Sequence, residues 1–241
     1  MISFSIGLSF LSSNTPKKIG HRKLLSAEAR RILSLLDGKP FQDNDIIKDE
    51  NGRPYFPNRR MDFNISHSGD AAAVSLVSGE GLRTGCDIEL VRPKVNAREI
   101  ADKYFSVLES DYIFSIKRNK DIEINFFTIW TLKECYLKLR GLSVFDMRKA
   151  PSFICGEDPD DGHFAFDAAA SSPGITGSPL SFYVYELKSA SGEIYLLSVS
   201  IEGDTHLRPE MRCFSQPLLS ARSIVEIKAA LNPTETVSPK M

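Results

Sequence analysis

The sequence predicts an α+β fold, because helices and strand pairs are mixed along the chain without the regular alternation of a doubly wound parallel sheet. Two observations support this prediction. Residues 126–140 repeat apolar side chains with the period of an amphipathic helix, and residues 71–91 have the form of a β-hairpin around Gly79-Glu80-Gly81. Each half of the chain contains a group of strands and one long helix, although no residue-level repeat is present.

The other elements follow from the same signals, taken in chain order. A strand is expected at residues 2–10, and a helix at 21–36 that ends at Gly38. Asn51 to Pro54 has the composition of a turn. Two short helices are expected at 98–104 and 106–116, strands at 63–65, 153–155, 163–168, 182–187 and 194–201, and a last helix at 221–231. The final ten residues have the composition of a disordered tail.

The composition is that of an ordinary globular protein, with 241 residues, 42% hydrophobic residues and a net charge of −1. The balanced charge argues against broad nucleic-acid binding, and no apolar run is long enough to predict a membrane span. The four cysteines, Cys86, Cys135, Cys155 and Cys213, are widely separated. Free thiols in a reducing cytoplasm are therefore expected.

The helix predicted at 126–140 has two different faces. Its apolar stripe consists of Ile129, Leu132, Cys135, Tyr136 and Leu139. The other side carries Lys133, Glu134 and Lys138, with Phe127 and Trp130 beside them. Alone, Glu134 and Lys138 are typical of an ion pair one turn apart on a solvated face. Two stretches upstream favour a functional role instead.

The first of these stretches is Gly85-Cys86-Asp87-Ile88-Glu89 in a predicted strand. Residues two apart share a strand face, so Asp87 and Glu89 project together while Cys86 and Ile88 point into the core. Two carboxylates on one face repel each other unless a cation lies between them, and Mg²⁺ suits such oxygen ligands. The alternative is an exposed acidic strand face.

The second stretch is Ser66-His67-Ser68-Gly69 at a predicted strand end, which has the form of a phosphate-binding loop. Serine hydroxyls and backbone amides donate hydrogen bonds, and His67 can add a positive charge. A turn whose serines bond to the backbone is the alternative. The cations His21, Arg22 and Lys23 at the start of an early helix indicate an anion site about as strongly as they indicate a solvated helix start.

Together these stretches supply the parts that a diphosphate bound through Mg²⁺ would need. The motifs occur in the order Gly52-Arg53-Pro54, Asn64-Ile65-Ser66-His67-Ser68, Gly85-Cys86-Asp87-Ile88-Glu89, then Trp130-Thr131-Leu132-Lys133-Glu134 with Lys138 and Gly141. This set resembles the 4′-phosphopantetheinyl transferases. The chain length and the tryptophan before Lys133 resemble the monomeric Sfp type rather than the short trimeric holo-carrier-protein synthases. The motifs cover residues 20–145, and a similar pattern of strands extends to about residue 200.

The resemblance implies a pseudodimer of two similar α/β-sandwich-like halves, residues 1–105 and 106–204, followed by a C-terminal extension at 205–241. It implies that coenzyme A binds in the cleft between the halves. It also implies Mg²⁺-dependent transfer of the 4′-phosphopantetheine group to a serine of an apo carrier protein, with release of adenosine 3′,5′-bisphosphate. The protein would act as a monomer in the cytoplasm, without nucleic acid or membrane as a partner.

The resemblance also implies a role for each matching residue. The ligands of Mg²⁺ would be Asp87, Glu89 and Glu134. Glu134 would serve as base for the serine hydroxyl, with Asp87 and Lys138 completing the catalytic set. The residues that bind coenzyme A would be Arg22, Arg53, Ser66, His67, Lys133 and Lys138. A Mg²⁺-dependent hydrolase of coenzyme A, or a binding module with a degenerate site, would be the alternative functions.

Overall fold

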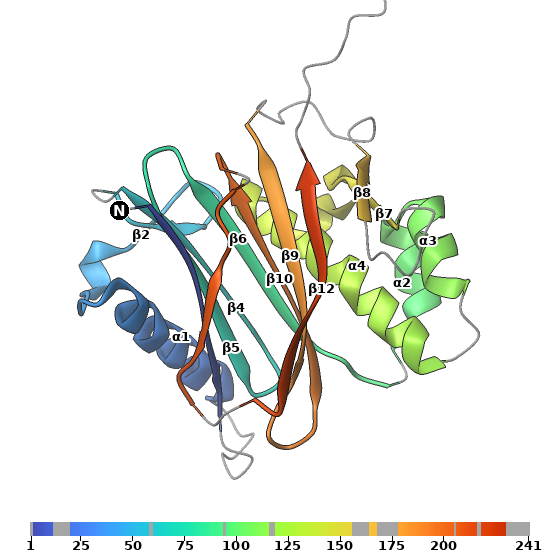
Figure 1. Ribbon diagram of the computed structural model, residues 1–241, viewed down its shortest axis with the longest axis horizontal. Helices are drawn as coiled ribbons and strands as arrows, with labels where there is room; N and C mark the ends of the chain where they lie inside the picture. The colour runs from blue at the N-terminus through green and yellow to red at the C-terminus, as the bar shows by residue number, and fades with distance from the viewer. Residues whose placement is uncertain are drawn as a thin grey trace, which may run out of the picture.

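The computed structural model describes residues 2–11, 20–57, 60–93, 95–115, 119–155, 164–167, 178–204, 206–215 and 218–229. The protein has an α+β fold, as predicted, with two four-stranded sheets and helices beside them (Figure 1). The strand orders are β11-β1-β5-β4 and β12-β9-β10-β6. None of the described helices is long and apolar enough to cross a membrane. The tail predicted to be disordered lies outside the described residues.

The first sheet contains β1 (Ser3–Phe10), β4 (Met61–Ser68), β5 (Ala71–Ser78) and β11 (Glu210–Cys213). The second sheet contains β6 (Arg83–Leu90), β9 (Leu180–Lys188), β10 (Ile194–Glu202) and β12 (Ser220–Ala229). Two small sheets are formed by β2 (Ile47–Lys48) with β3 (Pro54–Tyr55), and by β7 (Ser152–Cys155) with β8 (Phe164–Asp167). The helices are α1 (His21–Asp37), α2 (Ala97–Tyr104), α3 (Val107–Phe114) and α4 (Asn119–Arg140), and the 3-10 turns are η1 (Asp43–Asp45) and η2 (Val144–Lys149).

The core has layers, with α1 on one side, the two sheets in the middle and α4 on the other side. Strand β5 is buried on both faces, because Val74 packs with residues of α1 while Val77 packs with residues of the second sheet. Helix α4 covers β6 and β10 (Figure 1). The predicted apolar stripe of α4 is confirmed, since Ile129, Leu132, Cys135, Tyr136 and Leu139 are all buried. Gly38 ends α1 in a left-handed conformation with φ of 71°.

The predicted hairpin at residues 71–91 is wrong, although both of its strands exist. Strand β5 pairs with β1 and β4, whereas β6 pairs with β10 in the other sheet. The true hairpin partner of β5 is β4, which the short prediction at 63–65 underestimated. Ser66, His67 and Ser68 therefore lie in strand β4, not in a phosphate-binding loop. The glycines at residues 79–81 correctly indicated that the chain turns there. They could not indicate that the chain passes from one sheet to the other at this turn.

The helix predicted at 221–231 is also wrong, because this segment forms β12 and pairs antiparallel with β9. A bulge interrupts the pairing between Ser223 and Val225, and such an irregularity weakens the alternation that would have indicated a strand. Strand β11 pairs parallel with β1 in the first sheet. The C-terminal segment thus contributes one strand to each large sheet, while the division of the chain at residue 105 stays a prediction.

A seam of side-chain hydrogen bonds joins the two sheets where β4 runs along β6. Every second residue of β4 takes part, because alternate side chains of a strand share one face. Asp62 accepts from the backbone N–H of Thr84 at 2.8 Å, and Asn64 accepts from that of Cys86 at 3.3 Å. Further along, Ser68 accepts from the N–H of Leu90 at 3.2 Å. These bonds fix the position of β6 relative to β4.

Arg53 locks one end of the seam. Its guanidinium donates two hydrogen bonds to Asp62, at 2.8 and 2.6 Å, and further bonds to the carbonyls of Thr84 and Lys138 at 3.1 Å each. Both Arg53 and Asp62 are only 8% exposed. A single buried ion pair therefore connects β4, β6 and the end of α4.

We predict that Asp62→Ala lowers the free energy of unfolding by about 3–5 kcal/mol, because it leaves the Arg53 charge buried without its counterion. Urea denaturation measures this change. The matched control is Glu80→Ala, which removes the carboxylate of an exposed pair with Arg60 at 3.3 Å. Its effect is expected to stay below about 1 kcal/mol. Equal effects of the two substitutions would contradict the structural role of the seam.

Candidate active site

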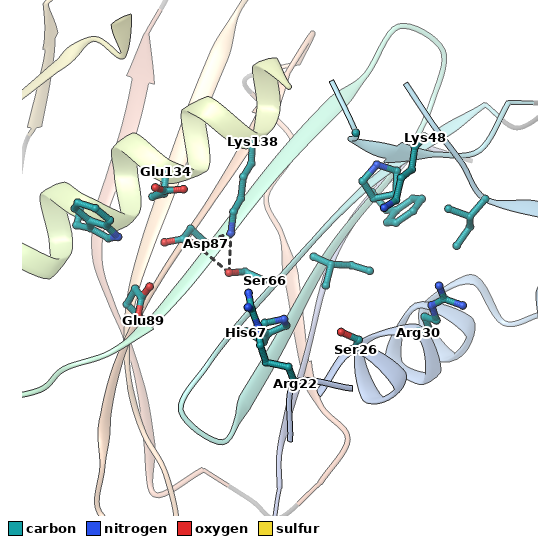
Figure 2. A pocket seen from close by; sticks show the side chains of 16 residues that line it. Arg22, Ser26, Arg30, Lys48, Ser66, His67, Asp87, Glu89, Glu134 and Lys138 are labelled. Atoms are coloured by element: carbon teal, nitrogen blue, oxygen red, sulfur yellow. Dashed lines mark hydrogen bonds and ion pairs between the residues drawn. The ribbon is translucent and has the colours of Figure 1, made fainter. Parts of the chain in front are cut away.

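A cavity with a volume of about 550 Å³ lies between α1, β4, β6 and α4. Figure 2 shows that most of its charged side chains are grouped by sign, with Lys138 as the cation that stands among the carboxylates. Carboxylates from β6 and α4 gather at one end, and cations from α1 and β2 stand at the other. The residues that line it are Arg22, Ser26, Arg30, Ile46, Lys48, Gly52, Pro54, Phe63, Ile65, Ser66, His67, Asp87, Glu89, Trp130, Glu134 and Lys138.

Asp87 and Glu89 project from β6 into this cavity, as predicted, while Cys86 and Ile88 are fully buried on the other face. Asp87 is only 3% exposed, so the alternative of an exposed acidic strand face does not hold for it. Two serines of β4 orient the carboxylates from across the seam. Ser66 donates to Asp87 Oδ1 at 2.8 Å, and Ser68 donates to Glu89 Oε2 at 2.5 Å.

Glu134 and Lys138 reach the same cavity from successive turns of α4. The Lys138 ammonium donates to Asp87 Oδ1 at 2.6 Å and to Ser66 Oγ at 2.8 Å (Figure 2). Burial by itself lowers the pKa of Lys138, but the Asp87 carboxylate outweighs this effect, so the pKa is raised overall. Lys138 therefore carries its charge between β4, β6 and α4.

Gly85 permits this close approach of α4 to β6. A Cβ atom at position 85 would lie 2.3 Å from the backbone oxygen of Cys135 and 3.0 Å from the Cβ of Leu139. Real Cβ atoms do not come this close to backbone oxygens, so any other residue would push the helix outward. The glycine before Cys86 thus has a packing function for the site.

Burial and repulsion among the carboxylates of Asp87, Glu89 and Glu134 raise the pKa values of Glu89 and Glu134. Burial raises the pKa of Glu134 to about 7, and the charges of Asp87 and Glu89 contribute to the increase. Burial and Asp87 also raise the pKa of Glu89, against the opposing hydrogen bond from Ser68. The cations Lys138 and Arg92 lower the pKa of Glu89, but its overall shift is still upward. The acidic end of the cavity is therefore suited to a positively charged ligand.

The opposite end of the cavity is basic and open to solvent. Arg22, Ser26 and Arg30 stand four residues apart on α1, so they form one stripe that faces the cavity. Lys48 lies at the rim on β2. His67 stands between the two ends, and burial lowers its pKa, as do the charges of Arg22 and Lys138. A neutral imidazole is favoured there, rather than the positive charge expected from the sequence.

Two predicted ligand-binding residues do not line this cavity. Arg53 belongs to the seam and borders a smaller neighbouring cavity of about 200 Å³. Lys133 is only 2% exposed, and its ammonium pairs with Glu109 at 3.1 Å. Successive residues of a helix are about 100° apart, so Lys133 cannot project together with Glu134. The sequence pattern placed both on one polar side because it could not show that Glu109 would be buried behind α4.

The comparisons with known proteins agree with the site. Residues 83–172, which include β6 and α4, match the family model described as the 4′-phosphopantetheinyl transferase superfamily. This region belongs to the 4′-phosphopantetheinyl transferase superfamily. The chain is 41% identical over 104 residues to the 4′-phosphopantetheinyl transferase AcpT of Escherichia coli K12, which is 43% of this chain and 52% of that protein.

Two further relatives support membership of this superfamily. The AcpT protein of Salmonella typhi is 38% identical over 111 residues, covering 46% of this chain and 56% of the relative. The transferase HetI of Nostoc sp. PCC 7120 is 28% identical over 146 residues, covering 58% and 60%. The match thus spans little more than half the length of these relatives. The family description and the names of these relatives are those of transferase enzymes. The Sfp type is suggested only by the sequence pattern.

The carboxylates at the acidic end are of the chemical type that binds divalent cations, although they do not converge on one point. Within the described part of the chain, no three His, Cys, Asp or Glu side chains stand close enough to hold one ion. However, Asp87 Oδ2 is buried and makes no hydrogen bond to any described group. Glu89 and Glu134 line the same end of the cavity, and hard cations prefer such oxygen donors. The three carboxylates thus have the donor chemistry that Mg²⁺ prefers, and to bind one ion they would have to move closer together.

Ser26, Arg30 and Lys48 were not expected from the sequence. The spacing of Arg22, Ser26 and Arg30 along one helix face is a signal that could have found two of them. Lys48 gives no such signal, because only the pairing of β2 with β3 brings it to the cavity rim. Among the described cysteines, Cys86, Cys135 and Cys213 are free thiols, as predicted.

We predict that Gly85→Ala lowers the free energy of unfolding by about 1–3 kcal/mol, because the added methyl group overpacks the contact between β6 and α4. It should also change the fluorescence of Trp130, the single tryptophan, which lies on α4 in the cavity wall. Thermal or urea unfolding and the emission spectrum measure these effects. Unchanged stability together with an unchanged spectrum would contradict the proposed role of Gly85.

Proposed function

We propose that the protein transfers the 4′-phosphopantetheine group of coenzyme A to a serine hydroxyl of an apo carrier protein and releases adenosine 3′,5′-bisphosphate. One observation carries the proposal: a single cavity with a carboxylate cluster at one end and cations at the other. Coenzyme A contains a diphosphate and a separate phosphate on the ribose. A cavity with two distinct charged ends suits a ligand with two separated phosphate sites.

At the acidic end, we assign Asp87, Glu89 and Glu134 to hold Mg²⁺. The bound ion would neutralise the diphosphate charge that three carboxylates would otherwise repel. Lys138 is placed to stabilise the negative charge that develops on the phosphate oxygens, because its ammonium stands between Ser66 and Asp87. Transfer of this type depends on positioning and charge neutralisation more than on covalent help from the protein.

Glu134 is our candidate for the base that accepts the proton of the incoming serine. It reaches the cavity from α4 next to Trp130, one turn away on the same helix face. The serine oxygen would then attack the phosphorus bonded to pantetheine, and the bond to the adenosine bisphosphate would break. The proton leaves the serine hydroxyl for Glu134, so the step is balanced without any further reactant.

At the basic end, we assign Arg22, Arg30 and Lys48 to the ribose phosphate of coenzyme A. His67 stands between the two ends, where its neutral ring can donate a hydrogen bond to a phosphate oxygen, whereas Ser66 already donates its hydroxyl proton to Asp87. Arg53 and Lys133 are not assigned to the ligand, since both make buried ion pairs with protein carboxylates. This assignment keeps three of the six ligand-binding residues expected from the sequence, Arg22, His67 and Lys138, while Ser66 orients Asp87 and Lys138.

We also propose that each large sheet is the centre of one half of a pseudodimer, with β6, from before residue 105, and β11, from after it, each lying in the sheet of the other half. In support, each large sheet has four strands and one long helix packed against it. Under this proposal the cavity lies at the junction of the halves, where β4 meets β6. Action as a monomer in the cytoplasm stays a prediction from the sequence.

The direct test of the proposed function uses purified protein, Mg²⁺, coenzyme A and several apo carrier proteins. Mass spectrometry should detect a carrier heavier by one phosphopantetheine, and EDTA should abolish the change. Absence of a mass shift with every carrier would contradict the proposal. Release of adenosine bisphosphate at an equal rate without a carrier would instead indicate a hydrolase.

We predict that Glu134→Gln reduces kcat at least about 100-fold, the lower range for loss of a general base. Stopped assays of carrier modification measure this effect. Glu123→Gln is the matched control, because Glu123 lies on the same helix but does not line the cavity. The control should keep kcat within about twofold. Full activity of Glu134→Gln would contradict the role of Glu134 as the base.

We predict that Arg22→Ala raises the KM for coenzyme A about tenfold with little change in kcat. Loss of one charge-assisted contact to phosphate, worth roughly 1.4 kcal/mol, corresponds to this factor. Lys39→Ala is the control, because Lys39 is also an exposed cation but lies outside the cavity lining. Similar KM values for the two variants would contradict the basic end as a phosphate site.

A further inference from the structure

Lys133 stands next to Glu134 in the sequence but is buried on another side of α4. Its ammonium donates to the backbone oxygen of Pro151 at 3.0 Å and pairs with Glu109 at 3.1 Å. Lys133 is 2% exposed and Glu109 is fully buried. Burial lowers the pKa of Lys133, while the Glu109 carboxylate opposes this effect. The charge of Lys133 is thus matched inside the protein.

Glu109 connects Lys133 to two other segments. Its Oε1 accepts from the backbone N–H of Phe153 at 2.9 Å, where β7 begins. Its Oε2 accepts from the N–H of Ser106 at 2.8 Å, which closes the capping box at the start of α3. One carboxylate therefore holds α4, α3 and β7 together, with both of its oxygens engaged.

Stability alone does not account for a charged pair at this position. Desolvation offsets much of the attraction between buried charges, and well-packed apolar pairs of similar size are often at least as stable. Hydrogen bonds differ from apolar contacts because they constrain the orientation of the groups that they join. Apolar packing tolerates small rotations of a helix, whereas bonds of about 3 Å to fixed partners do not.

The same network reaches the wall of the cavity through aromatic rings. The Phe105 ring lies 5.9 Å from the Lys133 ammonium and 6.4 Å from the Trp130 ring. Trp130 is also stacked on Phe126, with the ring centroids 6.1 Å apart. Trp130 and Glu134 line the cavity from one face of α4, so a rotation of the helix would displace both.

We propose that the Lys133–Glu109 pair is a positioning device that fixes the rotation of α4 and thereby aims Glu134 and Trp130 into the cavity. Lys133 is thus a positioning residue rather than a ligand of coenzyme A. This inference rests on the proposed transfer reaction, in which Glu134 contacts the reacting groups. It assigns a role to the lysine that precedes Glu134 without requiring it to touch the substrate.

The experiment replaces both charges by apolar side chains of similar size in Glu109→Leu/Lys133→Met. No charge is left unpaired, but the backbone N–H groups of Ser106 and Phe153 lose their acceptor, so the melting temperature should fall and kcat is measured well below it. We expect kcat for carrier modification to fall at least about tenfold, since a small misplacement of a reacting group has large effects on rate. The KM for coenzyme A should change less than about twofold, and the Trp130 emission should shift.

A charge-matched control is Glu210→Leu/Arg212→Met, which removes an exposed ion pair on β11. This variant should keep wild-type kcat, KM and Trp130 emission. Wild-type kcat in Glu109→Leu/Lys133→Met would overturn the positioning role. A raised KM for coenzyme A with unchanged kcat would overturn it as well, because that result is expected of a ligand-binding lysine.

Lys133→Arg provides a second test that does not depend on the folding of the apolar variant. It keeps the positive charge but alters the reach and geometry of the contact with Glu109. The positioning role predicts a reduced kcat, a shifted Trp130 emission and an unchanged KM. Retention of wild-type kcat and emission would contradict it. If the wild-type protein itself modifies no carrier, the proposed function fails, whereas the emission shifts still report on the helix.

Discussion

The seam between β4 and β6 is the constraint on which the rest of the structure depends. Alternate side chains of β4 take the place that a neighbouring strand would occupy, and Asp62, Asn64 and Ser68 bond to backbone N–H groups of β6. This arrangement leaves space between the sheets for polar groups. It places Ser66 against Asp87 and gives the cavity one wall from each sheet.

Two features on opposite sides of α4 complete the site. Toward the cavity, Gly85 lets the helix approach β6 so closely that Lys138 reaches Asp87. Behind the helix, Lys133 is held by Glu109. The contact at Gly85 sets how near α4 lies, and we propose that the Lys133 pair sets how it is rotated. Accumulated negative charge from Asp87, Glu89 and Glu134 is then the chemical consequence of this packing.

Much of the site could be predicted because its parts are local patterns. The period of two placed Asp87 and Glu89 on one face, and the period of 3.6 placed Glu134 and Lys138 together. The buried stripe of α4 was correct for the same reason. Arg53 and Lys133 were misplaced because their partners, Asp62 and Glu109, are distant in sequence or hidden by packing, and a charged residue beside a motif does not show which carboxylate it will meet.

The sequence by itself determined the α+β class, most of the elements and the carboxylate and lysine set, since these depend on side-chain periodicity and residue chemistry along short stretches. The tertiary structure decided that β5 and β6 belong to different sheets, that 220–229 is a strand, and that Lys48 and Arg30 reach the same cavity as Glu134. These outcomes depend on which surfaces of distant segments bury each other, and no local pattern contains that information.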